Sequence, residues 1–148
     1  MNDRCFVDTN LLMYARDATH PDKQARAAQW LERLWELRAG RLSVQVLQEY
    51  YVTVTSKLAP GLSAVEARDD VRALMTWEPL VTDGHVIEAA WRVHDRFRLS
   101  WWDALIVAAA QRCECRHLLT EDLQDGQDLG GMTVLDPFTR RPEEVLGL

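Results

Sequence analysis

The sequence predicts an α/β fold built on a short, mainly parallel sheet flanked by helices. Short apolar runs that suit buried strands alternate along the chain with longer stretches whose apolar residues recur at helical spacing. Several acidic residues directly follow apolar runs, and α/β folds gather functional groups where strands end and helices begin. A length of 148 residues suits one domain spanning residues 1–148.

Five short segments are expected to be strands or extended chain, because they are apolar and bounded by turn-forming residues. In chain order they cover residues 4–7, 41–44, 78–81, 117–120 and 132–135. A polar, glycine-bearing stretch at residues 125–131 separates the last two strands. Pro137 and Pro142 predict an irregular tail.

The expected helices start and stop at recognisable signals. Pro21 suits the first turn of a helix, and Gly40 suits the residue that follows one. Ser63 and Glu66 form a capping-box pattern. Helices are expected near residues 11–16, 21–38, 45–57, 63–75, 83–97 and 101–113. The last of these is apolar almost all round, so we expect it to lie centrally in the fold.

Composition and charge narrow the class of protein. The formal net charge of −6 argues against strong non-specific attraction to nucleic acid, which usually needs a basic face. It does not exclude nucleic acid, because a bound metal ion can neutralise clustered carboxylates locally. Three cysteines without a zinc-site or disulfide pattern indicate a reducing, cytoplasmic location. No signal peptide is predicted, and the longest apolar run, residues 104–110, is far shorter than the ~20 residues of a membrane span.

Four acidic residues stand beside apolar segments, where a globular protein seldom places them: Asp8, Glu49, Asp103 and Asp122. Carboxylates are rarely buried unless they are paired or bind metal. Two such charges ~4 Å apart repel by about 4 kcal/mol at an effective dielectric constant of about 20. Mg²⁺ or Mn²⁺ would offset that repulsion, and these ions assist phosphodiester hydrolysis by activating water and orienting phosphate.

Three of these acids also have simpler structural explanations. Asp8 could cap the helix that follows it, and Glu49 could be a solvated helical residue. Asp103 could complete a capping box with Ser100 and gain from the helix dipole. Capping and metal binding are compatible, since a carboxylate at a helix N-terminus can still face an ion.

The fourth position is the most open. Asp122 could be a turn residue, because the segment that follows it is rich in Asp and Gly. Its neighbours Glu121 and Asp125 compete with it for the same role. The position of Asp122 directly after the strand expected at residues 117–120 favours it, with Asp125 as a possible addition.

Four motifs follow one another along the chain: Phe6-Val7-Asp8-Thr9-Asn10, then Glu49, then Trp102-Asp103-Ala104-Leu105-Ile106, and last Leu119-Thr120-Glu121-Asp122. In this order they resemble PIN-domain ribonucleases, specifically VapC-type toxins of bacterial toxin–antitoxin pairs. The resemblance spans nearly the whole chain and implies a single PIN-like domain. It implies that the four acids Asp8, Glu49, Asp103 and Asp122 hold one or two Mg²⁺ or Mn²⁺ ions. Asn10 and Thr120 would then orient the site.

The resemblance also implies an activity and partners. It implies a metal-dependent endoribonuclease that cleaves structured RNA such as tRNA or rRNA, forms a homodimer and is inhibited by a cognate antitoxin. A non-catalytic PIN-like scaffold is the main alternative, and the intact set of acids argues against it. A phosphoaspartyl phosphohydrolase would need a later lysine near its phosphate. The chain has no lysine after Lys57, and Asn10 instead of Asp stands two residues after Asp8.

Overall fold

The computed structural model describes residues 3–147 as a set of short strands and longer helices. The strands are β1 (Cys5–Val7), β2 (Gly40–Arg41), β3 (His117–Leu119) and β4 (Thr133–Leu135). The α-helices are α1 (Thr9–Tyr14), α2 (Pro21–Leu37), α3 (Val44–Val52), α4 (Ala64–Leu74), α5 (Gly84–Phe97), α6 (Trp101–Arg112) and α7 (Pro142–Leu146). A π-helical turn, η1 (Thr53–Lys57), continues α3, and a 3₁₀ turn, η2 (Met75–Trp77), continues α4.

The strands form one parallel sheet in the order β2-β1-β3-β4. In the central pair, Val7 of β1 lies opposite Leu119 of β3. Parallel strands end at the same edge of a sheet, so the next residues along, Asp8 and Thr120, emerge side by side. The sheet therefore places two of the predicted site residues together at its carboxyl edge.

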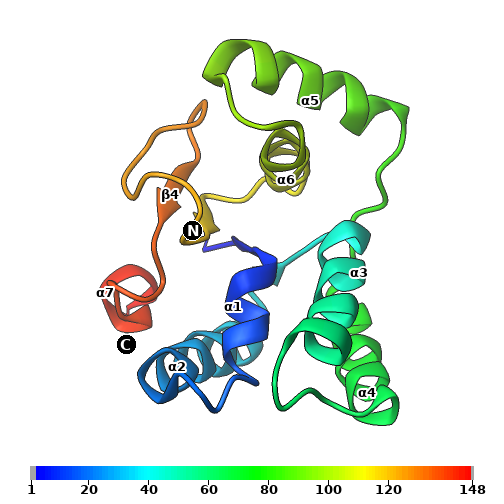
Figure 1. The fold of residues 1–148 in the computed structure, drawn as a ribbon. Coiled ribbons are helices and arrows are strands. Elements are labelled where there is room, and N and C mark those ends of the chain that lie inside the picture. Colours follow the sequence, from blue (N-terminus) through cyan, green and yellow to red (C-terminus); the bar gives the residue numbers. More distant parts are fainter. Residues whose placement is uncertain (1–2, 148) are drawn as a thin grey trace.

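Helices cover both sides of this sheet (Figure 1). Helices α5 and α6 pack against each other on one side, and α1 to α4 lie on the other. The strands are almost wholly buried, as expected for a parallel sheet between helical layers. Helix α6 is buried continuously from Ala104 to Ala110, which confirms the central position predicted for it.

The predicted α/β fold with a short parallel sheet is confirmed, but two expected strands are reduced. Of residues 78–81, only Leu80 pairs: its N–H donates to Leu42 and its carbonyl accepts from the N–H of Val44. Pro79 has no N–H to donate and Glu78 has a left-handed backbone (φ 55°), so the segment cannot extend the ladder. The strand expected at residues 41–44 is instead Gly40–Arg41, because Ser43 caps α3.

The tail is more regular than the prolines predicted, since Pro142 begins helix α7 instead of breaking one. This helix packs against α2. The fully buried Trp30 of α2 donates its indole N–H to the carbonyls of Pro137 (2.8 Å) and Arg140 (3.0 Å). No helix in residues 3–147 is long and apolar enough to cross a membrane.

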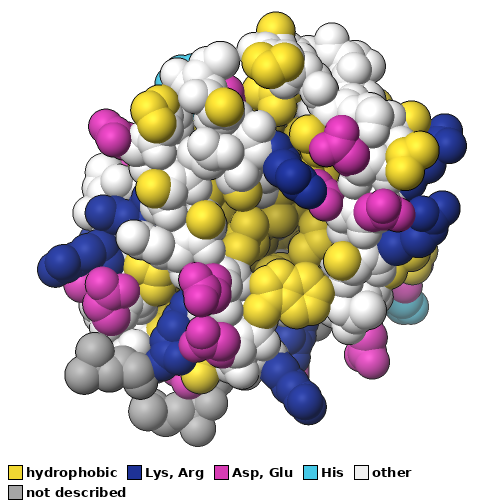
Figure 2. Space-filling view, turned by 90° about the horizontal axis from the view of Figure 1, so that it is seen from below, with side chains coloured by type: hydrophobic (Ala, Val, Ile, Leu, Met, Phe, Trp, Pro, Cys, Tyr) yellow, Lys and Arg dark blue, Asp and Glu magenta, His cyan; other side chains and the backbone are white. Residues whose placement is uncertain are grey.

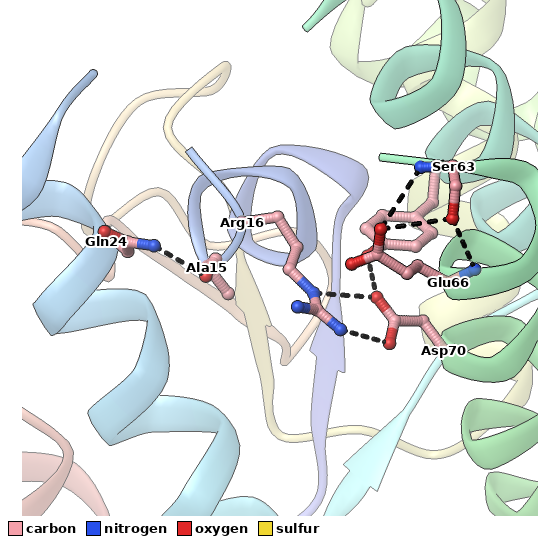
Figure 3. Close-up of polar contacts among 7 residues, drawn as sticks. Ala15, Arg16, Gln24, Ser63, Glu66 and Asp70 are labelled. Atoms are coloured by element: carbon pink, nitrogen blue, oxygen red, sulfur yellow. Dashed lines mark hydrogen bonds and ion pairs between the residues drawn. The ribbon is translucent and has the colours of Figure 1, made fainter. Parts of the chain in front are cut away.

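An ion pair and a hydrogen bond that the sequence did not predict join the turn after α1 and helix α3 to helix α4. Arg16 forks onto Asp70 with Nη2–Oδ1 and Nε–Oδ2 distances of 2.6 and 2.9 Å (Figure 3). The Tyr50 hydroxyl donates to the same carboxylate at 2.5 Å. The Ser63–Glu66 capping box at the start of α4 lies beside this cluster and confirms the prediction made for it (Figure 3).

A hollow of about 180 Å³ lies beside the Arg16–Asp70 pair, between α2 and α4. Its remaining lining is apolar except for Tyr50 and comes from Leu12, Ala15, Leu31, Trp35, Ala73 and Leu74. The view of this side of the molecule shows hydrophobic side chains at the bottom of a hollow and charged ones around it (Figure 2).

Candidate active site

Asp8 lies directly after β1 and is buried, with 7% of its surface exposed. Its Oδ1 accepts the N–H of Thr9 at 2.7 Å, which caps α1. Its Oδ2 accepts the hydroxyl of Thr120 at 2.8 Å. Capping therefore accounts for only one of the two carboxylate oxygens, and the other is held from the neighbouring strand β3.

Thr120 and Asn10 connect Asp8 to Asp122. The Thr120 hydroxyl, fully buried, accepts the side-chain N–H of Asn10 (3.2 Å) and the backbone N–H of Asp122 (3.1 Å) while donating to Asp8. The Asn10 amide also donates to Oδ2 of Asp122 at 3.2 Å. Both residues thus take positions suited to the orienting role predicted for them.

Glu49 points from α3 toward α1, and both of its carboxylate oxygens are held. Thr9 donates its hydroxyl to Oε2 at 2.9 Å, and Gln45 donates its side-chain amide to Oε1 at 2.9 Å. A merely solvated helical residue would not be fixed in this way. The contact from Gln45 was not predicted, although side chains four residues apart on a helix lie on the same face.

Asp103 lies in the first turn of α6, as predicted. Ser100 caps this helix by accepting the N–H of Asp103 at 3.1 Å. The reciprocal half of a capping box is missing, and within residues 3–147 the Asp103 carboxylate makes no hydrogen bond or ion pair. Its charge is close enough to Asp122 to raise the pKa of that residue. The structure therefore brings Asp103 toward the other acids, and apart from the favourable field of the helix N-terminus its carboxylate has no partner within residues 3–147.

The electrostatics of the site follow from burial and mutual repulsion. Burial is the largest cause that raises the pKa of Asp8 to about 6, with smaller increases from Asp122 and Glu49. Hydrogen bonds from Thr120 and Thr9 lower it only in part. The pKa of Asp122 is also raised, first by burial and then by Asp103 and other acids, against a lowering by Asn10. The four acids thus share one region in which negative charge is not compensated.

The two competitors of Asp122 are engaged elsewhere. Glu121 forms an ion pair with Lys23 of α2 at 2.8 Å. Both carboxylate oxygens of Asp125 accept hydrogen bonds from the guanidinium of Arg140. This bidentate contact is the main reason that the pKa of Asp125 is lowered. Asp125 also accepts the backbone N–H of Asp136. These contacts give both acids structural roles and favour Asp122 as the fourth member of the site.

The donor set fits a hard divalent cation. Carboxylate and amide oxygens are the ligands that Mg²⁺ and Mn²⁺ prefer, and no cation of residues 3–147 forms an ion pair with the four acids. The Asn10 Oδ1 is buried without a hydrogen-bond partner, which is costly unless something else contacts it. No three acidic, His or Cys side chains of residues 3–147 are yet arranged to bind one ion. The carboxylates would have to move closer together around it.

Comparisons with known proteins identify the family and the fold. A family model described as the PIN domain matches residues 5–124, a stretch that contains all four acids. The structure is similar to a chain of a toxin–antitoxin complex from Klebsiella pneumoniae, with a TM-score of 0.57 and 20% sequence identity. That alignment covers 90% of this chain and 97% of the other, and at such identity it concerns the fold alone. A search of curated protein sequences gave no significant match. Because the family match covers most of the chain, the protein belongs to the PIN-domain family.

Proposed function

We propose that this PIN-domain protein is a Mg²⁺- or Mn²⁺-dependent endoribonuclease that hydrolyses RNA phosphodiester bonds. One observation carries the proposal: only neutral groups hold Asp8, Glu49 and Asp122, and the charge of Asp103 is close enough to raise the pKa of Asp122. Such a site lacks positive charge, and a divalent cation together with a phosphodiester is a natural complement to it.

Each side chain of the candidate site has a proposed role. Asp8 and Asp103 would be the principal ligands of the ion, and Glu49 and Asp122 would complete its surroundings. When bound, the ion would act as a Lewis acid that activates water and stabilises charge on the phosphate. Asn10 and Thr120 link Asp8 to Asp122 through hydrogen bonds, while Thr9 and Gln45 fix the direction of Glu49.

The proposed biological role is that of a toxin in a toxin–antitoxin pair. The similarity in fold to a chain of a toxin–antitoxin complex supports this role and a cognate antitoxin as partner. Structured RNA of the tRNA or rRNA class is the proposed substrate, the cytoplasm the proposed location and a homodimer the proposed assembly. Exposed apolar side chains on and beside α4, Val65 and Met75 among them, offer surface for a protein contact.

The direct test is cleavage of purified tRNA and rRNA with Mg²⁺ or Mn²⁺, with the new 5′ ends mapped by sequencing. We expect Asp8→Asn and Asp122→Asn to abolish cleavage. Glu121→Gln is the matched control, because it changes an adjacent acid that pairs with Lys23, and it should leave cleavage intact. Cleavage by Asp8→Asn at the wild-type rate would refute the assignment.

The alternative is a PIN-like scaffold that binds partners and cleaves nothing. Calorimetric titration with Mn²⁺ separates the two, since the nuclease requires metal binding and the scaffold does not. No heat of binding, together with no cleavage of any RNA tested, would favour the scaffold.

A further inference from the structure

A hollow of about 380 Å³ adjoins Glu49, one of the four acids, on the side of α3 and η1. Two of its lining residues, Thr9 and Glu49, belong to the site described above. The others are Gln48, Val52, Thr53 and Lys57. The hollow therefore continues the acidic site along the helix, and it ends at a lysine.

Helix geometry explains why Lys57 lines the same hollow as Glu49. Glu49, Thr53 and Lys57 are spaced four residues apart, and in an α-helix each such step drifts by about 40° around the axis. After Val52 the helix widens into the π turn η1, in which the N–H of Leu58 reaches the carbonyl of Thr53 at 2.9 Å. A π turn holds more residues per turn and so opposes the drift, and such turns are frequent at functional sites.

The charge of Lys57 is available to a ligand. Within residues 3–147 Lys57 forms no ion pair, and its side chain is exposed. The other lysine of the chain, Lys23, is instead bound to Glu121 and lies over the rings of Tyr14 and Phe138. Lys57 thus lines a hollow together with Glu49 of the candidate active site.

We propose that this hollow is a subsite for a phosphate of single-stranded RNA next to the bond that is cleaved, with Lys57 as its cation. The inference rests on the proposed nuclease function. Lys57 lies about two helical turns from Glu49, so it would hold a neighbouring phosphate and not the reacting one. The side chains of Gln48 and Thr53 can donate hydrogen bonds to the same phosphate. Such a contact offsets the repulsion that the acids impose on the rest of the strand.

The test measures binding of a fluorescently labelled, mixed-sequence single-stranded oligoribonucleotide by anisotropy over a range of salt concentrations. All proteins carry Asp8→Asn, so that the probe is not cleaved. Lys57→Ala should weaken binding and reduce the slope of log K against log salt by about 0.7, the value for one phosphate contact with a single strand. Lys57→Arg should retain the slope. Arg33→Ala, which removes a cation of α2 paired with Glu36, should leave it unchanged.

The outcomes separate this inference from the nuclease proposal. With Asp8 intact, Lys57→Ala should raise KM and leave kcat nearly unchanged, because the contact holds bound substrate and transition state alike. Equal salt slopes for Lys57→Ala and its parent would overturn the subsite, even if the wild type cleaves RNA. A reduced slope in a protein that never cleaves RNA would keep the subsite and refute the nuclease. Circular dichroism of each variant checks that the fold is retained.

Discussion

Asp8 and Asp70 are both partly or wholly buried acids, but only Asp70 has a cation as its partner. Asp70 receives a guanidinium fork from Arg16 and a hydroxyl from Tyr50. Its carboxylate raises the pKa of Arg16, and burial together with this carboxylate raises the pKa of Tyr50. Asp8 receives only neutral donors, and its own pKa is raised to about 6. The first arrangement is complete within the chain, whereas the second leaves charge uncompensated.

This difference separates acids that support the fold from acids that support a function. Where an acid joins structural elements, the chain supplies a cation: Arg16 for Asp70 and Lys23 for Glu121. Within residues 3–147 no cation forms an ion pair with the four acids of the candidate site, although the chain contains 17 Lys and Arg residues. Uncompensated acids destabilise the metal-free fold, and perturbed groups of this kind cluster at functional sites.

The largest expected effect is stabilisation by metal. Mn²⁺ at about 100 times its Kd should raise the free energy of unfolding by about 2.7 kcal/mol, since it binds only the folded site. Urea unfolding at pH 8 with and without Mn²⁺ measures this change. Asp70→Asn should retain the increase, and Asp122→Asn should lose most of it. An equal increase in Asp122→Asn would show that the ion binds elsewhere.

The second largest expected effect is the loss of stability in Asp70→Asn, which removes the charge that Arg16 contacts. We expect the free energy of unfolding to fall by about 2 kcal/mol, less than for a fully buried pair because 42% of the Arg16 side chain is exposed. Asp69→Asn is the matched control on the same helix, and its exposed pair with Arg72 should contribute little. The difference in stability between Asp70→Asn and Asp69→Asn should shrink in about 1 M salt, because salt screens the attraction between Asp70 and Arg16. Equal stability of the two variants would contradict the structural role of Asp70.

The third prediction is that the same Asp-to-Asn change at Asp8 stabilises the fold, whereas at Asp70 it destabilises the fold. Without metal, Asp8→Asn should raise the free energy of unfolding at pH 8 by about 1–2 kcal/mol, because it removes a buried charge but also disturbs the contact from Thr120. A pKa raised from 3.8 to about 6 means that the folded state holds its proton more tightly. The wild type should therefore lose stability as pH rises through this window, relative to Asp8→Asn.

The measurement is urea unfolding of both proteins in EDTA between pH 4 and pH 8. The gain from Asp8→Asn should vanish near pH 4, where Asp8 is protonated in the folded wild type. A gain that is constant across this pH range would have a cause other than the Asp8 charge.

The fold was largely predictable because buried strands and helix signals are local. The apolar runs located β1, β3 and β4 to within a residue or so, and Ser63 with Glu66 located the start of α4. The errors arose where non-local contacts decide. Trp30 orders the tail from a position over a hundred residues away, and the widened turn at η1 has no sequence signal that we used.

The sequence indicates the four acids of the candidate site, but it does not indicate how their side chains are held. Motifs indicated Asp8, Glu49, Asp103 and Asp122, and strand order alone places two of the motifs side by side. The choice between Asp122 and Glu121 needed the contact of Glu121 with Lys23, which are 98 residues apart. No local pattern can reveal which of two adjacent acids meets a distant cation.

The Thr120 hydroxyl has a consequence for the chemistry of the site. A hydroxyl oxygen has one proton and two lone pairs, and Thr120 uses all three, on Asp8, Asn10 and Asp122. It has nothing left to offer a ligand, so it serves as a bridge between the carboxylate of Asp8 and the groups that position Asp122. A serine could replace it atom for atom in that task, whereas a valine of the same shape would leave the gap between the two acids without a bridge.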